Sequence, residues 1–526
     1  MTAIDPGMPY DAVIVGSGFG GSMVAQQLLD AGWRVLMIER GGWVPRGPEN
    51  WADGAVGTLT PYYSTETPYR AVAGAARDVV GSFNCVGGPS VFYGGASLRF
   101  RAEDFEPCPE IVGASGAVWP YRYADVEPHY SRAEQLLGVA GERGSDPTEP
   151  FHSARYPQMP GALAPTSRLV WDAAQRLGLH PSRLPLAFNH GAGKGRAPCA
   201  ACSTCDGFAC AIGAKNDLAT AVLPALVRRG LRLEANTVAV RLVAEGSRLN
   251  AVDCVERESG RRVRYFGRHF VLSAGALASP HLLLASGLDR LNPGGRTVGR
   301  YLMRHFNAAV IGLFPRRPDR EAQFHKQVAI HDFYFGHPSV GWPRGKLGAI
   351  QQIGKPPREL VKAYLPKLLG SVAAAALPHV TGLLVMAEDQ PRPENRVETF
   401  PARTDRFGLP ELRITHRYTP RDIQAGRVLI AKAREILHTA GAWFTYAQPI
   451  RTFSHAVGTV RMGTDPQTSA LDAQCRFRGT ENLYVVDGSS FPTSAAVNPS
   501  LTIAANALRA GERIAALSRG RDATAA

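Results

Sequence analysis

Four cysteines fall within twelve positions in the stretch CAACSTCDGFAC, residues 199–210. They are half of the eight cysteines in the chain. Clustered thiols can ligate a metal, take part in redox chemistry, or pack as small apolar side chains. The residue types alone leave all three hypotheses open, so spacing and surroundings must decide. The four are Cys199, Cys202, Cys205 and Cys210.

Their spacing argues against zinc, because a structural zinc site usually takes two C-x₂-C pairs separated by a dozen or more residues. Iron–sulfur is the stronger metal hypothesis, since C-x₂-C-x₂-C is similar to the three-ligand run of bacterial ferredoxins. Cys210 follows one residue too late for that run, however, and Ala211 replaces the usual proline. We therefore predict no metal, with reduced thiols that are structural or redox-active, and iron–sulfur as the alternative. A fourth ligand would come from Cys85, Cys108, Cys254 or Cys475.

A dinucleotide-binding unit is predicted near the N-terminus from the stretch YDAVIVGSGFGGSMVAQQLLDAGWRVLMIER. Residues 11–15 form an apolar run typical of a buried strand, and residues 34–38 predict a second strand. A helix is expected between them, up to about residue 30. The motif G-x-G-x-x-G lies between the first strand and this helix, which is the context that makes it specific.

Each glycine of that motif has a physical role. Gly16 permits the tight turn, and Gly18 lets a pyrophosphate approach the backbone at the helix N-terminus. Gly21 lets helix and strand pack closely. Glu39 ends the second strand, where a carboxylate can accept hydrogen bonds from ribose hydroxyls. These residues predict a bound dinucleotide without deciding between NAD and FAD.

Composition limits the class of protein. A chain of 526 residues exceeds what one hydrophobic core serves, so two or more lobes are expected. The net charge is +14, but the basic residues are scattered, which favours a solvated surface over a nucleic-acid site. No apolar run reaches eighteen residues and the N-terminus lacks signal-peptide features, so we expect no transmembrane segment. A cytoplasmic protein is expected.

Three further stretches carry a family resemblance. They are NCVGGPSVFYGGASLRFRAEDF at 84–105, GALASPHLLLASGLD at 275–289 and, within 455–508, HAVGTVRMGTDP with NLYVVDGSSFPTSAAVNPSLTIAANAL. Together they resemble the glucose–methanol–choline oxidoreductases, FAD-dependent alcohol oxidases and dehydrogenases. The likeness runs from Tyr10 to about Ile514 in the family's order. It implies that the dinucleotide is FAD, and the lack of histidine between residues 70 and 110 predicts non-covalent binding.

The resemblance also assigns cofactor contacts beyond the glycine-rich turn. Tyr93 departs from the family pattern, because relatives usually have Asn or His there beside the flavin. The strand expected at 483–486 ends at the cofactor edge of the sheet, and Pro499 opens the following helix. The predicted cofactor contacts are Gly16, Gly18, Gly21, Glu39, Gly87, Gly88, Ser90, Val238, Asp487, Gly488, Asn498 and Pro499.

Two residues are expected to carry the reaction. Alcohol oxidation needs a base for the hydroxyl proton while hydride leaves the carbon, and a donor that holds the developing alkoxide. By resemblance, the base is His455 in the H-x-x-G motif and the donor is Asn498, about forty residues later. Histidine suits the first role because its unperturbed pKa of about 6.5 lies near working pH.

The resemblance implies a two-domain α/β fold. A Rossmann-like FAD-binding domain is expected from residues 1–300 and 441–526, including the cysteine-rich segment. An α+β substrate-binding domain built on an antiparallel sheet is expected from residues 301–440. Within it, residues 392–419 predict antiparallel strands over the flavin. Residues 358–377 predict an apolar helical face that packs in the core, covers the pocket, or contacts a membrane or partner.

The predicted function is FAD-dependent oxidation of a small-molecule alcohol to an aldehyde or ketone, by a dehydrogenase that passes electrons to a quinone or protein. An oxidase that uses oxygen and forms hydrogen peroxide is the alternative within this class. A non-catalytic flavin-binding regulatory or carrier protein is the alternative of another class. The presence of both His455 and Asn498 argues against that last hypothesis.

Overall fold

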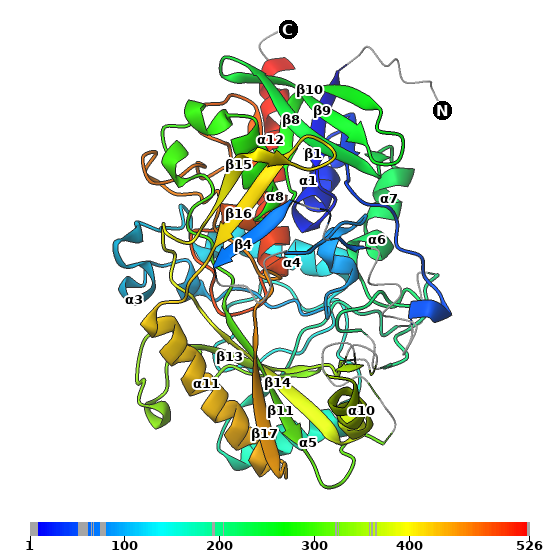
Figure 1. Cartoon of the computed structure of the whole chain (residues 1–526), viewed down its shortest axis with the longest axis vertical. Coiled ribbons are helices and arrows are strands. Elements are labelled where there is room, and N and C mark those ends of the chain that lie inside the picture. Colours follow the sequence, from blue (N-terminus) through cyan, green and yellow to red (C-terminus); the bar gives the residue numbers. More distant parts are fainter. Residues whose placement is uncertain are drawn as a thin grey trace.

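The computed structural model describes residues 9–50, 62–64, 66, 68–73, 80–191, 195–202, 205–320, 323, 326–356, 358, 361–362 and 366–522. It has two lobes stacked along the long axis, and both ends of the chain lie at the far end of one of them (Figure 1). The described helices include none that combines the length and the apolar character needed to cross a membrane.

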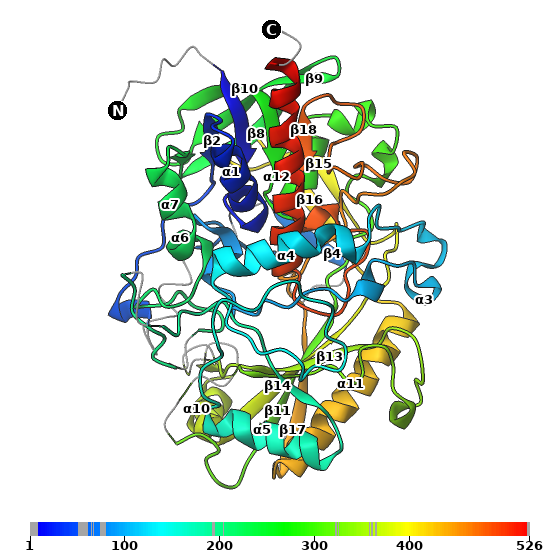
Figure 2. The same cartoon turned by 180° about the vertical axis from the view of Figure 1, so that it is seen from behind.

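The first lobe is built on a parallel sheet in which β1 lies between β2 and β10. Both β1 and β2 are buried along their whole length apart from Asp11, as expected for strands covered on both faces. The long helices α1 and α12 lie side by side against this sheet, and α4 crosses below them (Figure 2). The parallel order is β7 (Arg232–Glu234), β2 (Val35–Ile38), β1 (Tyr10–Val15), β10 (Arg262–Leu272) and β18 (Leu483–Val485). The helices are α1 (Phe19–Asp30), α4 (Tyr123–Leu137) and α12 (Ser500–Asp522).

Strand β10 belongs to two layers. Its second half pairs with β1 and β18, whereas its first half pairs antiparallel with β9 (Arg248–Glu256), which pairs in turn with β8 (Thr237–Glu245). Exposure alternates along β10 as far as His269, and only its last three residues are continuously buried. That change follows from a strand with one solvated face entering a sheet that is covered on both faces.

The second lobe is built on a six-stranded antiparallel sheet. Helices α5 (Pro165–Arg176) and α11 (Pro420–Thr439) cover one face and form a separate hydrophobic core with it. The sheet order is β17 (Phe444–Ile450), β11 (Phe306–Leu313), β14 (Val380–Ala387), β13 (Gly348–Ile353), β12 (Val328–Ile330) and β6 (Pro181–Arg183). The predicted fold class, a Rossmann-like domain with an antiparallel second domain, is confirmed. Strands β6 and β17 come from outside residues 301–440, so the sheet draws on more of the chain than that range.

The hairpin predicted at 392–419 is present, but it does not join the six-stranded sheet. Strands β15 (Arg396–Thr404) and β16 (Pro410–Thr415) pair with each other, and β4 (Tyr69–Ala73) adds to β16 in parallel. Strand β4 is more than three hundred residues away from β16 in sequence. Local turn signals therefore predicted the hairpin but could not predict which sheet it joins.

The helix predicted within 358–377 is interrupted: residues 358, 361 and 362 are helical, Pro366 is not, and a helix follows it. α10 (Lys367–Ala376) starts directly after Pro366, because proline lacks the N–H that a helix interior needs but is tolerated at the start. Leu368, Leu369 and Val372 are exposed, whereas Gly370 and Ala374 are buried. The prediction that this apolar row packs in the core is therefore wrong for the residues that the structure describes. Leu360, Tyr364 and Leu365 lie outside the described residues.

Shorter elements complete the described chain. They are β3 (Tyr63–Ser64), β5 (Ser82–Phe83), α3 (Pro109–Val112), α6 (Leu218–Ala221), α7 (Leu223–Arg228) and α8 (Ala278–Ala285).

Candidate active site

The carboxyl ends of the parallel strands gather the predicted dinucleotide residues at one edge of the sheet. Gly16 follows β1 with φ +100°, and a Cβ there would overlap the carbonyl oxygen of Ser273, which follows β10. A Cβ at Gly21 would overlap the carbonyl oxygen of Gly16. The Gly21 amide also donates to Ser273 Oγ at 2.6 Å. Both glycines are therefore required by close packing of helix α1 on the sheet.

Gly18 differs from these two glycines because its missing side chain leaves open space. Among the described residues, no atom lies within 4 Å of an ideal Cβ at Gly18, outside its chain neighbours and its own helix. Helix α1 begins at the next residue, so its N-terminal amides face this opening. A helix N-terminus beside free space fits a pyrophosphate. Gly88 closes the far side, since its Cβ would lie 3.3 Å from the Gly18 Cα.

Ser17 connects the predicted ribose carboxylate to the second glycine loop. Ser17 N and Ser17 Oγ donate to Glu39 Oε2 at 3.1 and 2.6 Å, and Gly41 N donates to Glu39 Oε1 at 2.9 Å. Burial raises the pKa of Glu39 in spite of these bonds. Gly87 N donates to Ser17 Oγ at 2.9 Å, and Ser90 Oγ donates to Gly87 O at 2.7 Å. The structure thus brings these predicted residues into one hydrogen-bonded set.

Val238 joins the same region through the backbone. It is buried at the start of β8, and the amide of the preceding Thr237 donates to Glu39 O at 2.9 Å. Val238 therefore lies beside the end of β2 that carries the carboxylate.

Asp487 and Gly488 hold the C-terminal motif against the sheet edge. Asp487 Oδ2 accepts from Gly275 N at 2.9 Å and Ser279 Oγ at 2.5 Å. Gly458 N donates to Gly488 O at 3.0 Å, and two further amides of the 458–462 segment donate to residues 489 and 490. These bonds place the H-x-x-G motif next to the end of β18.

The two predicted catalytic residues meet there. Asn498 Nδ2 lies 3.4 Å from His455 Nε2. Asn498 precedes Pro499 and helix α12, whose first residue is Ser500. Asn498 Oδ1 accepts from Gln351 Nε2 on β13 at 3.3 Å. The site therefore combines the C-terminal motif with a strand of the second lobe.

His455 is held in its neutral form. Burial lowers its pKa to about 3, neighbouring His305 and the Lys326 ammonium act in the same direction, and Asp206 opposes them. A neutral imidazole has one nitrogen with a free lone pair, which is the form that can accept a proton. The site thus has an uncharged proton acceptor beside an amide donor, at the edge that fits a dinucleotide.

Comparison with known proteins places this geometry in a family. The N-terminal model of the GMC oxidoreductases matches residues 10–307, and the C-terminal model matches residues 391–507. The chain belongs to the GMC oxidoreductases. It is therefore a flavoprotein oxidoreductase with FAD as its cofactor, and the opening at Gly18 with the carboxylate of Glu39 fits that group.

Individual relatives agree over nearly the whole length. The enzyme is 30% identical to 6'''-hydroxyparomomycin C oxidase of Streptomyces lividus, with 96% of this chain and 91% of that protein covered. It is 26% identical to 2-methyl-1,2-propanediol dehydrogenase of Mycolicibacterium austroafricanum, with 96% and 95% covered. A solved FAD-dependent oxidoreductase from Chaetomium thermophilum superposes with a TM-score of 0.64 at 17% identity, covering 97% of this chain and 100% of that one, and so shares the fold.

Sequence reasoning missed two residues that contact the predicted catalytic pair, His305 and Gln351. His305 Nδ1 lies 3.3 Å from His455 Nδ1, and both His305 and Gln351 are buried. One signal was available for Gln351, because the buried strand GAIQQI carries two amides in an otherwise apolar run. No comparable pattern marks His305.

Tyr93, which departs from the family pattern, lies next to the dinucleotide turn. Its ring meets Phe19, the first residue of α1, edge to face with centroids 5.7 Å apart. Its carbonyl oxygen accepts from Lys215 Nζ at 2.8 Å. The same ammonium donates to the carbonyl oxygens of Cys205 and Phe208 at 3.0 and 2.7 Å. Lys215 therefore fastens the cysteine-rich segment to the loop predicted to contact the flavin.

Within the described part of the chain, the four clustered cysteines form no disulfide. A hydrogen bond that the Cys205 thiol makes to Cys202, together with burial, raises the pKa of Cys205 well above its usual range, and burial raises the pKa of Cys199. Among the described residues, no three His, Cys, Asp or Glu side chains are arranged to hold a metal. Residues 203 and 204 lie outside that description. The segment approaches the reaction centre through Asp206, which influences the pKa of His455.

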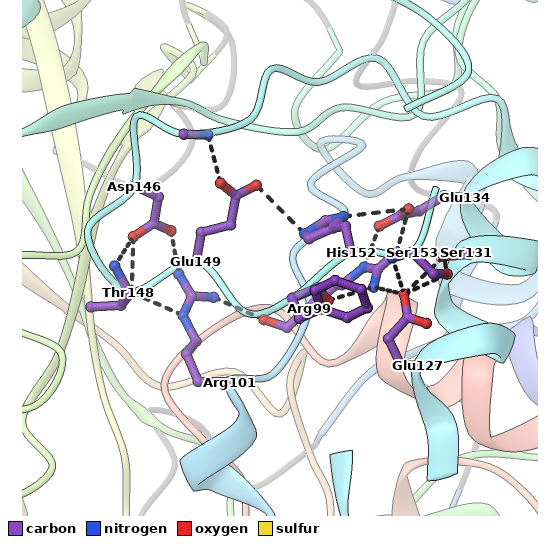
Figure 3. A network of polar contacts seen from close by, with 12 residues as sticks. Arg99, Arg101, Glu127, Ser131, Glu134, Asp146, Thr148, Glu149, His152 and Ser153 are labelled. Atoms are coloured by element: carbon purple, nitrogen blue, oxygen red, sulfur yellow. Dashed lines mark hydrogen bonds and ion pairs between the residues drawn. The ribbon is translucent and has the colours of Figure 1, made fainter. Parts of the chain in front are cut away.

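A second buried polar cluster, the Arg99 network, lies between α4 and the loop that follows it (Figure 3). Arg99 Nε and Nη2 donate to the two oxygens of Glu134 at 2.7 and 2.8 Å, and Nη1 donates to Glu127 Oε1 at 2.9 Å. His152 lies between carboxylates, with Nε2 3.5 Å from Glu149 Oε1. This network is made of paired charges, unlike the centre at His455.

Proposed function

We propose that this GMC oxidoreductase oxidises an alcohol to an aldehyde or ketone, with His455 as the base. The observation that supports the proposal is the 3.4 Å approach of His455 Nε2 and Asn498 Nδ2 at the edge where the dinucleotide residues converge. FAD, when bound, supplies the hydride acceptor. A carrier protein has no need for a buried neutral base paired with an amide donor at that edge.

The two side chains divide the work at the substrate oxygen. His455 Nε2 takes the hydroxyl proton, and because burial keeps the imidazole neutral, the acceptor lone pair is present without prior deprotonation. Asn498 Nδ2–H donates to the oxygen as negative charge develops on it, and an amide does this without changing its own charge. Gln351, by donating to Asn498 Oδ1, orients the amide so that its N–H faces the substrate.

We assign substrate binding to the lobe of the six-stranded sheet, with residues 301–440 as its main part, and FAD binding to the remainder. The support is that Gln351 reaches the centre from β13 of that sheet, while the glycine-rich turn and Asp487 reach it from the parallel sheet. The alcohol then lies between the two lobes.

For the electron acceptor, we propose a quinone or protein, as in a dehydrogenase. The relative named 2-methyl-1,2-propanediol dehydrogenase supports this choice. Oxygen is the second candidate, because the relative with the higher identity is named an oxidase.

Anaerobic flavin reduction with a panel of alcohols tests the reaction. Bleaching of the flavin absorbance by at least one alcohol, with formation of the matching carbonyl, is expected. Reoxidation is then compared between air and a quinone-like dye. An FAD-loaded enzyme that no alcohol of a broad panel reduces, while a chemical reductant does, would contradict the proposed function.

Retention of the cofactor is tested at Gly18. We expect Gly18→Leu to lose FAD, because the side chain would occupy the opening in front of α1. Gly191→Leu is a matched control, since a Cβ there also meets no atom of the described residues within 4 Å and the residue is exposed. Flavin content per chain after purification is the measurement. Equal FAD content in both variants would remove Gly18 from the pyrophosphate site.

A further inference from the structure

His305 lies directly behind the proposed base. It precedes β11 and is fully buried. Its Nδ1 is 3.3 Å from His455 Nδ1, and its Nε2 is 3.0 Å from the carbonyl oxygen of Ser494. The two imidazoles meet nearly edge to face, with centroids 5.3 Å apart. His305 is thus bonded through both ring nitrogens, one of them to the base.

These contacts determine where the protons lie. A carbonyl oxygen can only accept, so His305 Nε2 must carry its hydrogen. Burial lowers the pKa of His305, so the ring is neutral and its Nδ1 is a bare acceptor. His455 Nδ1 must then donate to it. Since neutral His455 has one N–H, its Nε2 carries no hydrogen and has the lone pair that a base requires, which accepts from Asn498 Nδ2 until a substrate hydroxyl takes that place.

The amides on the other side agree with this assignment. A bare His455 Nε2 requires a donor, which is Asn498 Nδ2, and this turns Asn498 Oδ1 toward Gln351 Nε2. Every hydrogen bond from the Ser494 carbonyl to Gln351 then has one donor and one acceptor. The donor and acceptor of every hydrogen bond in this series are therefore fixed, because the Ser494 carbonyl at one end can only accept.

The backbone at the Ser494 end of this series of hydrogen bonds is held in an unusual conformation. His305 and Ala495 have φ of 60° and 53°, the left-handed region that costs a non-glycine residue roughly 1 kcal/mol or more. Asp389 Oδ1 accepts from His305 N and from Ser494 Oγ, both at 3.0 Å, and Glu388 Oε1 accepts from Ala495 N at 3.0 Å. Both acids follow β14, so one strand end holds both strained residues in place.

We infer that His305 is a positioning residue that accepts the His455 Nδ1 hydrogen and so keeps the Nε2 lone pair facing the substrate. The inference rests on the proposed function, because it concerns the base of that reaction. It assigns to His305 no contact with substrate or cofactor. It requires only that a group at this position accept from His455 and donate to the Ser494 carbonyl.

Two substitutions separate this role from packing. In His305→Gln the side-chain amide can accept through Oε1 and donate through Nε2, so both bonds can be kept. In His305→Phe a ring of similar size fills the space without either bond. Both variants are purified with FAD, their FAD content and thermal unfolding are matched to the unmodified enzyme, and flavin reduction is followed anaerobically over a range of alcohol concentrations.

We expect His305→Phe to lower the limiting rate of flavin reduction by roughly 10- to 100-fold, the usual effect of removing a partner that orients a histidine. The alcohol concentration at half-saturation is expected to stay unchanged, and His305→Gln to recover most of the rate. A His305→Phe enzyme with full FAD and a normal rate would overturn the inference. Equal losses in His305→Gln and His305→Phe, both fully loaded with FAD, would also overturn it.

If His305→Phe does not retain FAD, His305→Ala with added imidazole decides. Imidazole in the vacated space can make both bonds, so a rate that rises with imidazole supports the inference, and a loaded variant that imidazole does not accelerate overturns it. His455→Ala is measured in parallel. Loss of rate in His455→Ala with normal rates at His305 refutes only the positioning role, whereas a normal rate in His455→Ala refutes the proposed function itself.

Discussion

His152 is buried and His455 is half-buried, and both have a pKa lowered to about 3, yet their surroundings differ. His152 lies in the Arg99 network, where arginines and carboxylates face one another across short distances (Figure 3). Within the described residues, the hydrogen bonds of His455 are with neutral groups, a second imidazole and an amide. A shifted pKa is therefore no guide to function here, because burial is the first cause at both sites. The two sites differ in their partners. At His152 the charged groups pair with one another, whereas at His455 a nitrogen lone pair lies at the cofactor edge of the sheet.

The largest effect is expected from opening the Arg99 network. Arg99→Leu leaves Glu134 buried without its bidentate partner, and removing one side of a buried ion pair costs about 3–5 kcal/mol. Flavin reduction by the fraction that remains folded should be unchanged. Chemical unfolding of the FAD-loaded enzyme measures the loss of stability, and stopped-flow spectroscopy measures the rate of flavin reduction.

Arg122→Leu is the matched control for that experiment. Arg122 is 83% exposed and lies 4.0 Å from Glu106, so the loss of this pair should change stability by no more than about 1 kcal/mol. If both substitutions destabilise the enzyme equally, the network is no more than a set of surface pairs.

The opposite pattern is expected at His455. His455→Ala should slow flavin reduction by on the order of 10²-fold or more, the usual contribution of a general base, while FAD stays bound. His152→Gln serves as control, since it removes a histidine with a similar pKa and should leave the reduction rate unchanged. A slower rate in His152→Gln than in His455→Ala would reverse the comparison.

A smaller catalytic loss is expected at the amide. Asn498→Ala removes one donor to the developing alkoxide and should slow reduction by roughly 10- to 10³-fold. Asn482 is also a buried asparagine, but its amide donates to the backbone of Leu249 and Arg268, far in sequence from this motif. Asn482→Ala should lower stability and spare the rate per folded enzyme. Rates measured at equal FAD content distinguish the two.

How much of the fold and of the candidate site the sequence predicts depends on how far apart in sequence the interacting residues lie. The turn at Gly16, Gly18 and Gly21 with its flanking strands was predicted correctly, because close packing and helix dipoles act over a few residues. The meeting of His455 with Asn498 followed from resemblance alone. In the structure it depends on amides of residues 458–462 that donate to residues 488–490, a pairing with no local signal.

Other features lay beyond sequence reasoning for the same reason. Strand β6 pairs with β12 about 150 residues later, and β4 pairs with β16 at a still greater separation. No periodicity within either strand encodes its partner. His305 is revealed as a neighbour of the base by its two ring contacts, and the Arg99 network by burial of both signs of charge. These are properties of the folded chain.

The smallest expected effect concerns pH. Because the pKa of His152 and of His455 is lower in the folded enzyme than the unperturbed value of about 6.5, the unfolded chain binds a proton first as pH falls. As the pH falls from 6.5 to about 3, each histidine therefore lowers the free energy of unfolding, by up to about 1.4 kcal/mol per pH unit. Glu127 acts at lower pH: bonds from Ser153, Arg99 and Ser131 outweigh burial and lower its pKa to about 2, so its contribution is present above about 4.5 and is lost below.

The contributions of His152 and Glu127 to the loss of stability in acid can be separated by pH. Between pH 6.5 and 4.5, His152→Gln should flatten the loss of stability seen in the unmodified enzyme, because glutamine takes up no proton in the unfolded chain. Below pH 4.5 the variant should still lose stability as Glu127 protonates. Unfolding free energies measured at half-unit steps test this, and a His152→Gln slope equal to that of the unmodified enzyme above pH 4.5 would show that the buried imidazole of the network contributes nothing to acid sensitivity.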